Sequence, residues 1–218
     1  MLKSVRSFSL VAAVLCFFTA GARAQSSHPG LERTLSHVEL GVSVPLEYTA
    51  TTSGKVVQSQ SVSSAAGYLI NIRYTKSPWI GAEMNYKFSR FSQNYVYSVP
   101  GNPAYPPLGI DASVKELTWG YVVHTANTYA GFKPYAALGV GTTDFVPTPN
   151  GGQGLLRQFR ATYYWNAGTD YNFSDSHFGA RVQVRELIYL APDFGQNYLT
   201  SGARTHTIEP SIGFYARF

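Results

Sequence analysis

Eight segments of this chain alternate, residue by residue, between apolar side chains and polar or small ones. They cover approximately residues 36–48, 64–74, 79–92, 112–124, 132–145, 155–172, 177–190 and 204–218. A two-residue period is typical of a β-strand whose two faces meet different surroundings, and turn-forming residues separate the segments. The sequence therefore predicts an all-β fold of eight strands.

The connections between these segments alternate in length. Residues 49–63, 93–111, 146–154 and 191–203 form the longer connections, and residues 75–78, 125–131 and 173–176 form the shorter ones. Long loops at one end and tight turns at the other are typical of an up-and-down membrane barrel. Every segment also exceeds the roughly 9–11 residues that a tilted strand needs to cross a membrane. We therefore expect an eight-stranded antiparallel up-and-down transmembrane β-barrel, the size at which side chains just fill the interior.

The N-terminal segment predicts export. Lys3 and Arg6 precede an apolar stretch over residues 8–20, and Ala22-Arg23-Ala24 follows it. This order of a basic head, a short apolar core and a small-residue site is typical of a secretory signal peptide. An uncleaved membrane anchor is the alternative, although the apolar stretch is shorter than the about 20 residues of a spanning helix. The expected organisation is a signal peptide over 1–24, a flexible lead-in over 25–34 and the barrel over 35–218.

The composition supports a barrel that faces lipid. Charged residues make up 13% of the chain, about half of the fraction expected of a soluble domain, and aromatic residues make up 15%, with 16 Tyr. A soluble β-sandwich is the alternative interpretation. Without the signal, basic and acidic residues are nearly equal in number, so we expect no nucleic-acid partner. The one cysteine, Cys16, lies in the signal, so disulfides do not hold the exported domain together.

Eleven charged residues within the segments share the parity of the polar face. They are Glu39, Arg73, Glu83, Lys87, Glu116, Arg160, Asp170, Arg181, Arg185, Glu209 and Arg217. In an eight-stranded barrel this face lines a narrow lumen, where an unpaired charge costs several kcal/mol. Because acids and bases are nearly balanced, we predict a plugged lumen with an ion-pair network, including a pair between Glu39 and Arg217. The alternative is a narrow ion path lined by the same charges.

Catalysis has weak support in the sequence. His206 lies on the apolar face by parity, and Ser176-His177 is better explained as part of a turn. Outer-membrane lipid hydrolases carry a His-x-Ser-Asn arrangement on a strand, and no such arrangement occurs here. Metal-ligand spacings and phosphate-binding glycine loops are also absent from the sequence. We therefore predict no enzymatic activity, no cofactor and no metal site.

Two stretches resemble the OmpA/OmpX-like eight-stranded outer-membrane β-barrel family. They are residues 131–141, with the sequence GFKPYAALGVG, and residues 166–181, with the sequence NAGTDYNFSDSHFGAR. The resemblance implies a location in the outer membrane of a Gram-negative-type bacterium. Many such proteins carry an additional peptidoglycan-binding domain, and we expect only the barrel domain here.

The C-terminal segment and the long loops predict the partners. Ile212, Phe214 and Phe218 form an apolar stripe that, by the same resemblance, the β-barrel assembly machinery reads. The outward face is expected to contact outer-membrane lipid and lipopolysaccharide, and the loops 49–63 and 93–111 are expected to meet any surface ligand. The predicted role is structural, in adhesion or envelope integrity. A narrow porin-like channel, a passage for hydrophobic compounds and a barrel-embedded lipid hydrolase are the alternatives.

Overall fold

The computed structural model describes residues 36–54, 56–97, 107–173 and 177–218, and the barrel occupies His37–Phe218. The predicted signal peptide over 1–24 and the lead-in over 25–34 lie outside the described residues. Within these described stretches, no helix has the length and apolar character needed to cross a membrane.

Nine strands and one short helix follow one another among the described residues. They are β1 (Val38–Thr49), β2 (Val57–Val62), β3 (Ala65–Thr75), β4 (Ile80–Tyr97), β5 (Leu108–His124), β6 (Phe132–Pro147), β7 (Gln158–Asn172), β8 (Phe178–Leu190), the 3-10 helix η1 (Asn197–Leu199) and β9 (Arg204–Arg217). All strand pairings are antiparallel. Every strand except β2 belongs to a closed ring, in the order β4-β3-β1-β9-β8-β7-β6-β5. The pairing of β4 with β5 completes the ring. The predicted eight-stranded antiparallel barrel is therefore confirmed.

The seam of the barrel joins the first strand to the last. Glu39 lies opposite Arg217, and Val42 lies opposite Phe214. The backbone N–H of Phe218 extends this ladder by donating to the carbonyl of Val38. The C-terminal strand thus has a hydrogen-bonded neighbour on each side, β1 and β8, so it presents no open edge for aggregation.

The prediction that residues 49–63 form a loop is wrong in part. Residues 57–62 form β2, which pairs with β4 where β4 extends beyond β3. The loop predicted over 93–111 is also shorter, since β4 continues to Tyr97 and β5 begins at Leu108. These extensions are rich in Ser, Gln and Asn because they leave the apolar belt, so no alternation between apolar and polar faces identified them.

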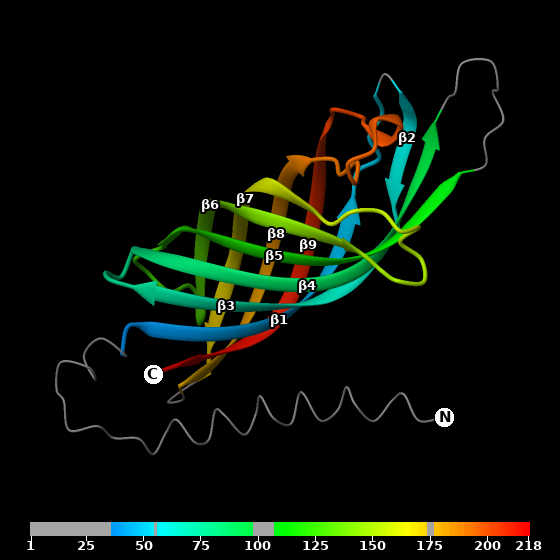
Figure 1. The fold of residues 1–218 in the computed structure, drawn as a ribbon. Helices are drawn as coiled ribbons and strands as arrows, with labels where there is room; N and C mark the ends of the chain where they lie inside the picture. The colour runs from blue at the N-terminus through cyan, green and yellow to red at the C-terminus, as the bar shows by residue number, and fades with distance from the viewer. Residues whose placement is uncertain (1–35, 55, 98–106, 174–176) are drawn as a thin grey trace, which may run out of the picture. The chain divides into compact units, whose positions relative to one another are not determined.

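The two ends of the barrel differ in their connections. The short turns 76–79 and 125–131, the end of β7 and the start of β8 lie at one end, here named the turn end, together with the C-terminus. The connections 148–157 and 191–203, the end of β4 and the start of β5 lie at the other, the loop end, which also carries β2 (Figure 1). Alternate residues of each strand point inward and outward, so the polar face becomes the interior and the apolar face becomes the outer wall.

Candidate functional site

The barrel interior contains the charged residues that parity assigned to the polar face. Nine of the eleven predicted residues are buried: Glu39, Arg73, Glu83, Lys87, Glu116, Asp170, Arg181, Arg185 and Glu209. They form two clusters at different heights. Seven residues make up the turn-side cluster: Glu39, Asn71, Arg73, Glu83, Asp170, Arg181 and Arg217. Five make up the loop-side cluster: Glu47, Lys87, Glu116, Arg185 and Glu209.

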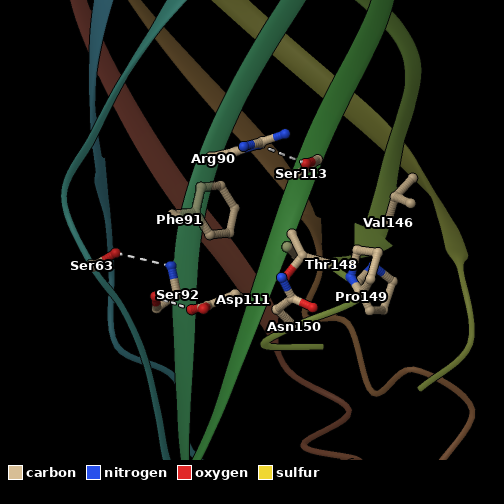
Figure 2. Close-up of a pocket in the computed structure, with 12 residues that line it drawn as sticks. Ser63, Arg90, Phe91, Ser92, Asp111, Ser113, Val146, Thr148, Pro149 and Asn150 are labelled. Atoms are coloured by element: carbon tan, nitrogen blue, oxygen red, sulfur yellow. Dashed lines mark hydrogen bonds between the residues drawn. The ribbon is translucent and has the colours of Figure 1, made fainter. Parts of the chain in front are cut away.

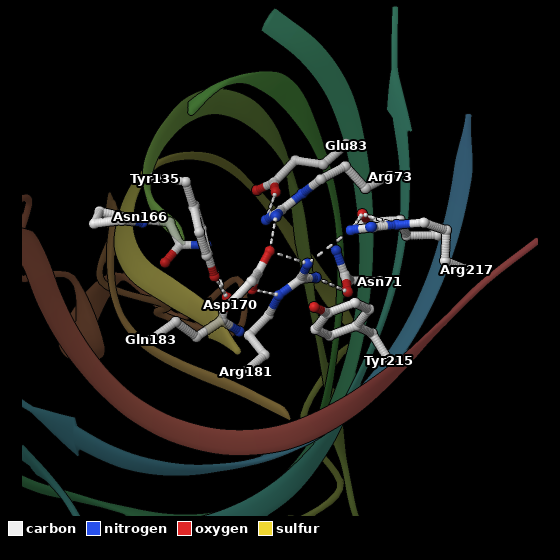
Figure 3. A network of polar contacts seen from close by, with 12 residues as sticks. Asn71, Arg73, Glu83, Tyr135, Asn166, Asp170, Arg181, Gln183, Tyr215 and Arg217 are labelled. Carbon is white, nitrogen blue, oxygen red and sulfur yellow. Dashed lines mark hydrogen bonds and ion pairs between the residues drawn. The ribbon is translucent and has the colours of Figure 1, made fainter. Parts of the chain in front are cut away.

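Arg181 lies at the centre of the turn-side cluster. Its Nε and Nη2 donate to the two carboxylate oxygens of Asp170 at 2.6 and 2.8 Å, its Nη1 donates to Asn71 at 2.7 Å and its Nη2 also reaches Glu39 at 3.1 Å (Figure 3). Arg73 bridges Glu83 at 2.8 Å and Asp170 at 3.1 Å. The cluster holds three carboxylates and three guanidinium groups, so its formal charge is zero.

Arg217 closes the turn-side cluster at the barrel mouth. Its Nη2 donates to Glu39 at 2.7 Å across the β1–β9 seam, while the side chain remains 41% exposed. Glu39 therefore receives one cation from the interior and another from the mouth. The pair is formed by strand neighbours, as the sequence predicted from barrel closure.

Lys87 is the hub of the loop-side cluster. Its Nζ pairs with Glu209 and lies 3.2 Å from Glu47 and 3.3 Å from Glu116. Arg185 pairs with Glu116 and, at 3.1 Å, with Glu209. Five buried charges from five strands thus meet at one height in the barrel. Each has an oppositely charged partner, which a charge at this depth requires.

Tyrosine rings connect the clusters and occupy the space above inward-facing glycines. Tyr164 donates to Glu83 at 3.0 Å, and the guanidinium of Arg185 lies 5.3 Å from the centre of its ring. A Cβ placed on Gly139 would lie 2.6 Å from that ring, and one on Gly179 would lie 2.4 Å from the ring of Tyr215. The absence of side chains at these glycines leaves room for the aromatic rings that fill the lumen.

An apolar cap covers the loop-side cluster at the loop end. Its buried members include Val57, Phe91, Tyr95, Ile110, Phe145, Leu187, Tyr189, Phe194 and Leu199. Phe194 and Leu199 come from the connection between β8 and β9. Gln158 holds this connection in place, since its Oε1 accepts the backbone N–H groups of Asp193 and Phe194 at 3.0 Å each.

Asp193 anchors the cap in a second way. Burial alone would raise the pKa of this carboxyl. Hydrogen bonds from the Gln158 side chain and the Gly195 N–H, together with the charge of Arg160, lower the pKa below its usual value instead. Arg160 pairs with Asp193 at 3.1 Å. The inclusion of Arg160 in the lumen network is therefore corrected: it contacts neither cluster, because β7 carries it up to the loop end.

Parity could also have identified Glu47, which the sequence analysis missed. It shares the parity of Glu39 on β1 and is buried beside Lys87. His124 has the same inward orientation and is buried, and neither ring nitrogen has a hydrogen-bond partner among the described residues. Those residues also include no group of three or more His, Cys, Asp or Glu side chains arranged to hold a metal ion.

A family comparison identifies this architecture. The family model described as "Outer membrane protein beta-barrel domain" matches residues 10–214. The chain belongs to this family. The protein is accordingly an outer-membrane protein, as the sequence predicted.

The chain is similar to solved outer-membrane barrels. Neisserial surface protein A is 11% identical, with a TM-score of 0.54 over 84% of this chain and 97% of that one. The Ail protein of Yersinia pestis is 13% identical, with a TM-score of 0.45 and coverages of 82% and 97%. The N-terminal barrel of Pseudomonas aeruginosa OprF is 15% identical, with a TM-score of 0.38 and coverages of 80% and 96%. No curated protein matches the sequence.

The outer wall of this outer-membrane barrel is apolar. Its exposed side chains include Val44, Leu46, Ile72, Ile80, Met84, Leu117, Val123, Leu138, Val140, Val182, Val184, Ile208, Ile212 and Phe214. Trp79, Phe132, Tyr171, Phe178 and Phe218 are exposed near the turn end, where an interfacial aromatic girdle is expected. Short turns of such barrels face the periplasm and long loops face outward, so the loop end is the extracellular end.

One polar group lies on this outer wall. His206 Nδ1 lies 2.7 Å from Glu186, whose other carboxylate oxygen accepts from the indole N–H of Trp165. His206 therefore points outward, as its parity predicted, and has a carboxylate partner that the sequence analysis did not anticipate. No Ser or Thr hydroxyl among the described residues hydrogen-bonds to His206. Ser176, the other residue considered for catalysis, lies outside the described residues.

Proposed function

We propose that the protein is a non-enzymatic structural barrel of the outer membrane, with a plugged, ion-paired lumen and loops that serve adhesion or envelope integrity. The observation that carries this proposal is the interior, in which two layers of paired charges lie beneath an apolar cap. These three layers follow one another from the turn side of the interior to the loop end. The rigid wall then presents the loops. Binding residues are commonly found on loops that a rigid scaffold holds in place.

The energetics favour a closed lumen. Besides the pairs between neighbouring strands, some of the buried charges have partners across the barrel, as in the pairs Arg73–Asp170 and Lys87–Glu209. Opening a continuous path would separate such pairs inside a narrow space of low polarity, and breaking a buried pair costs about 3–5 kcal/mol. A conducting state would have to break several pairs and displace the cap. These costs argue against the narrow channel and against a passage for hydrophobic compounds.

The described residues place no nucleophile where the lipid-hydrolase alternative would need one. The pair of Glu186 and His206 would resemble a base with its orienting carboxylate, but acyl transfer also needs a hydroxyl or thiol within hydrogen-bond reach of the base. The only hydrogen-bonded partner of the His206 imidazole in the described part of the chain is Glu186. We therefore assign this pair a structural role in the wall of the barrel and no catalytic role.

The proposed partners follow from the surfaces. The outward stripe of Ile212, Phe214 and Phe218 is 63%, 68% and 45% exposed and is available to the assembly machinery before insertion. The apolar wall meets membrane lipid, including lipopolysaccharide in the outer leaflet. With the strand bounds corrected, the regions proposed to meet a surface ligand are 50–64, which includes β2, and the connection 98–107.

Planar-bilayer recording tests the plugged lumen. The purified, folded barrel is expected to give no sustained conductance at neutral pH, because the ion pairs and the cap leave no continuous water path. A wide porin inserted in the same bilayer serves as the positive control. Steady single-channel openings from the wild-type protein would contradict the plug and would favour the ion-path alternative.

One substitution tests the cap without changing the charged clusters. Gln158→Ala removes the side chain that holds the backbone of Asp193 and Phe194, so amides of residues 193–199 are expected to exchange hydrogen at least tenfold faster, the equivalent of about 1.4 kcal/mol. Conductance should stay absent because both charged clusters remain. Gln153→Ala is the matched control, since Gln153 only reaches the Gly109 carbonyl at 3.4 Å. Equal exchange in the two variants would contradict the role assigned to Gln158.

A further inference from the structure

Three cations lie where the apolar wall ends on the β4–β7 side of the barrel. Along β4, β5 and β7 the outward row passes through the apolar side chains Tyr86, Leu117 and Phe159. The next outward positions toward the loop end include the exposed residues Arg90, Lys115 and Arg157. On the neighbouring strands β4 and β5 the outward row therefore becomes cationic at Arg90 and Lys115, and Arg157 immediately precedes β7. This border is the extracellular edge of the membrane belt.

The three cations form one continuous patch through the strand register. Arg90 lies opposite Ser113, and its Nε donates to the Ser113 hydroxyl at 3.1 Å. Lys115 is two residues from Ser113 on the same face of β5, so it is a diagonal neighbour of Arg90. Asp144 of β6 lies opposite Lys115. Arg157 donates two hydrogen bonds of 2.8 Å each to the Asp144 carboxylate.

The patch is ordered at its ends and has free binding capacity in its centre. The guanidinium of Arg157 stacks 4.5 Å from the ring centre of Phe159, which fixes its orientation. The side chain of Lys115 has no ion-pair or hydrogen-bond partner among the described residues, and the Nη groups of Arg90 have none there either. Asp144 lies opposite Lys115 and Asp111 lies diagonally to Arg90, so three cations and two carboxylates leave one net positive charge. The unpaired ammonium and guanidinium groups suit an anionic phosphate.

A polar groove adjoins Arg90. It has a volume of about 580 Å³ and runs between β4, β5 and the connection after β6 (Figure 2). Ser92, Ser113, Thr148 and Asn150 contribute hydroxyl and amide groups to its lining. Asp111 also lines the groove, where it accepts from the Ser92 hydroxyl. Such groups hydrogen-bond readily to phosphate and to sugar hydroxyls.

We propose that Arg90, Lys115 and Arg157, with the groove beside Arg90, bind the phosphorylated headgroup of a glycolipid in the outer leaflet. The headgroup phosphates would contact the cations, its sugars would enter the groove, and its acyl chains would lie on the apolar wall below. The continuity of cations with that wall favours an amphipathic lipid over a soluble polyanion, which would gain nothing from the apolar surface. This inference deepens the lipid contact proposed above and does not depend on the plugged lumen.

The test measures binding of a defined lipid to the folded barrel in uncharged detergent. The probe is a diphosphorylated, six-chain glucosamine disaccharide lipid, and the variant is the double substitution R90Q/K115Q. A cation near an anionic lipid headgroup strengthens binding about fivefold, so the double variant should bind about 30-fold more weakly. The matched control is K76Q/K133Q, which removes two cations near the turn end and should stay within about twofold of wild type.

Three further measurements show whether the lipid phosphates, free phosphate or misfolding account for the change in binding. The same lipid without its phosphates should bind wild type as weakly as the intact lipid binds R90Q/K115Q. Inorganic phosphate at millimolar concentration should not displace the lipid. A heat-dependent shift in gel mobility should show that all variants are folded. Equal losses in the two double variants, unchanged binding of the dephosphorylated lipid, or full displacement by inorganic phosphate would each overturn the proposal, and none of these results bears on conductance.

Discussion

Replacing Arg181 with methionine is expected to lower the free energy of unfolding by about 3–5 kcal/mol. Arg181 is fully buried and donates to Asp170, Asn71 and Glu39 within 3.1 Å. Methionine has a similar length but no charge, so the turn-side cluster would keep three carboxylates with two cations. The measurement is equilibrium unfolding in urea after refolding into lipid vesicles, followed by tryptophan fluorescence and by gel mobility.

Two further variants separate lost charge balance from lost packing. Arg157→Met removes an arginine whose side chain is 56% exposed and pairs with Asp144, and such an exposed pair contributes little to stability. The double variant D170N/R181M restores a balance of two carboxylates and two guanidinium groups. It should therefore be more stable than R181M alone, a coupling that a double-mutant cycle measures. If R181M and R157M are equally stable, the cluster does not hold the barrel together as the geometry indicates.

The alternation of side chains predicted the fold because the barrel gives each strand one apolar and one polar environment. Parity alone assigns Glu39, Arg181 and Glu209 to the interior, and the structure places them there. Neighbouring strands also follow from topology, which is why the contact between Glu39 and Arg217 could be anticipated at the seam. A two-residue period predicts the face on which a residue lies, and topology predicts the neighbouring strand.

Contacts across the lumen need the height of each residue as well as its face. Lys87 on β4 meets Glu47 from β1 and Glu209 from β9. Those partners depend on the strand register and tilt, which no single segment of sequence encodes. The cap was unpredictable for a related reason: Phe194 and Leu199 lie in a connection without alternation, and only the closed barrel provides the apolar pocket that buries them.

Gly139→Val is expected to destabilise the barrel by about 3 kcal/mol, at the upper end of the usual cost of overpacking. A Cβ at this position would lie 2.2 Å from the carbonyl oxygen of Trp119 and 2.6 Å from the Tyr164 ring. The first contact is with the backbone of β5, so a change of rotamer cannot relieve it. Urea unfolding in vesicles and the fraction of heat-shifted protein on a gel would both report the loss.

Gly109→Val is the matched control for this substitution. A Cβ on Gly109 would meet only the Asn94 side chain, at 3.4 Å, and valine favours a strand more than glycine does. That variant should keep the stability of wild type or exceed it slightly, because glycine weakens a strand interior. If G139V matched G109V in stability, β5 and β6 would have to lie farther apart at Gly120 and Gly139 than the structure places them. The inward glycines would then serve strand curvature alone and would not make room for the tyrosine that joins the two charged clusters.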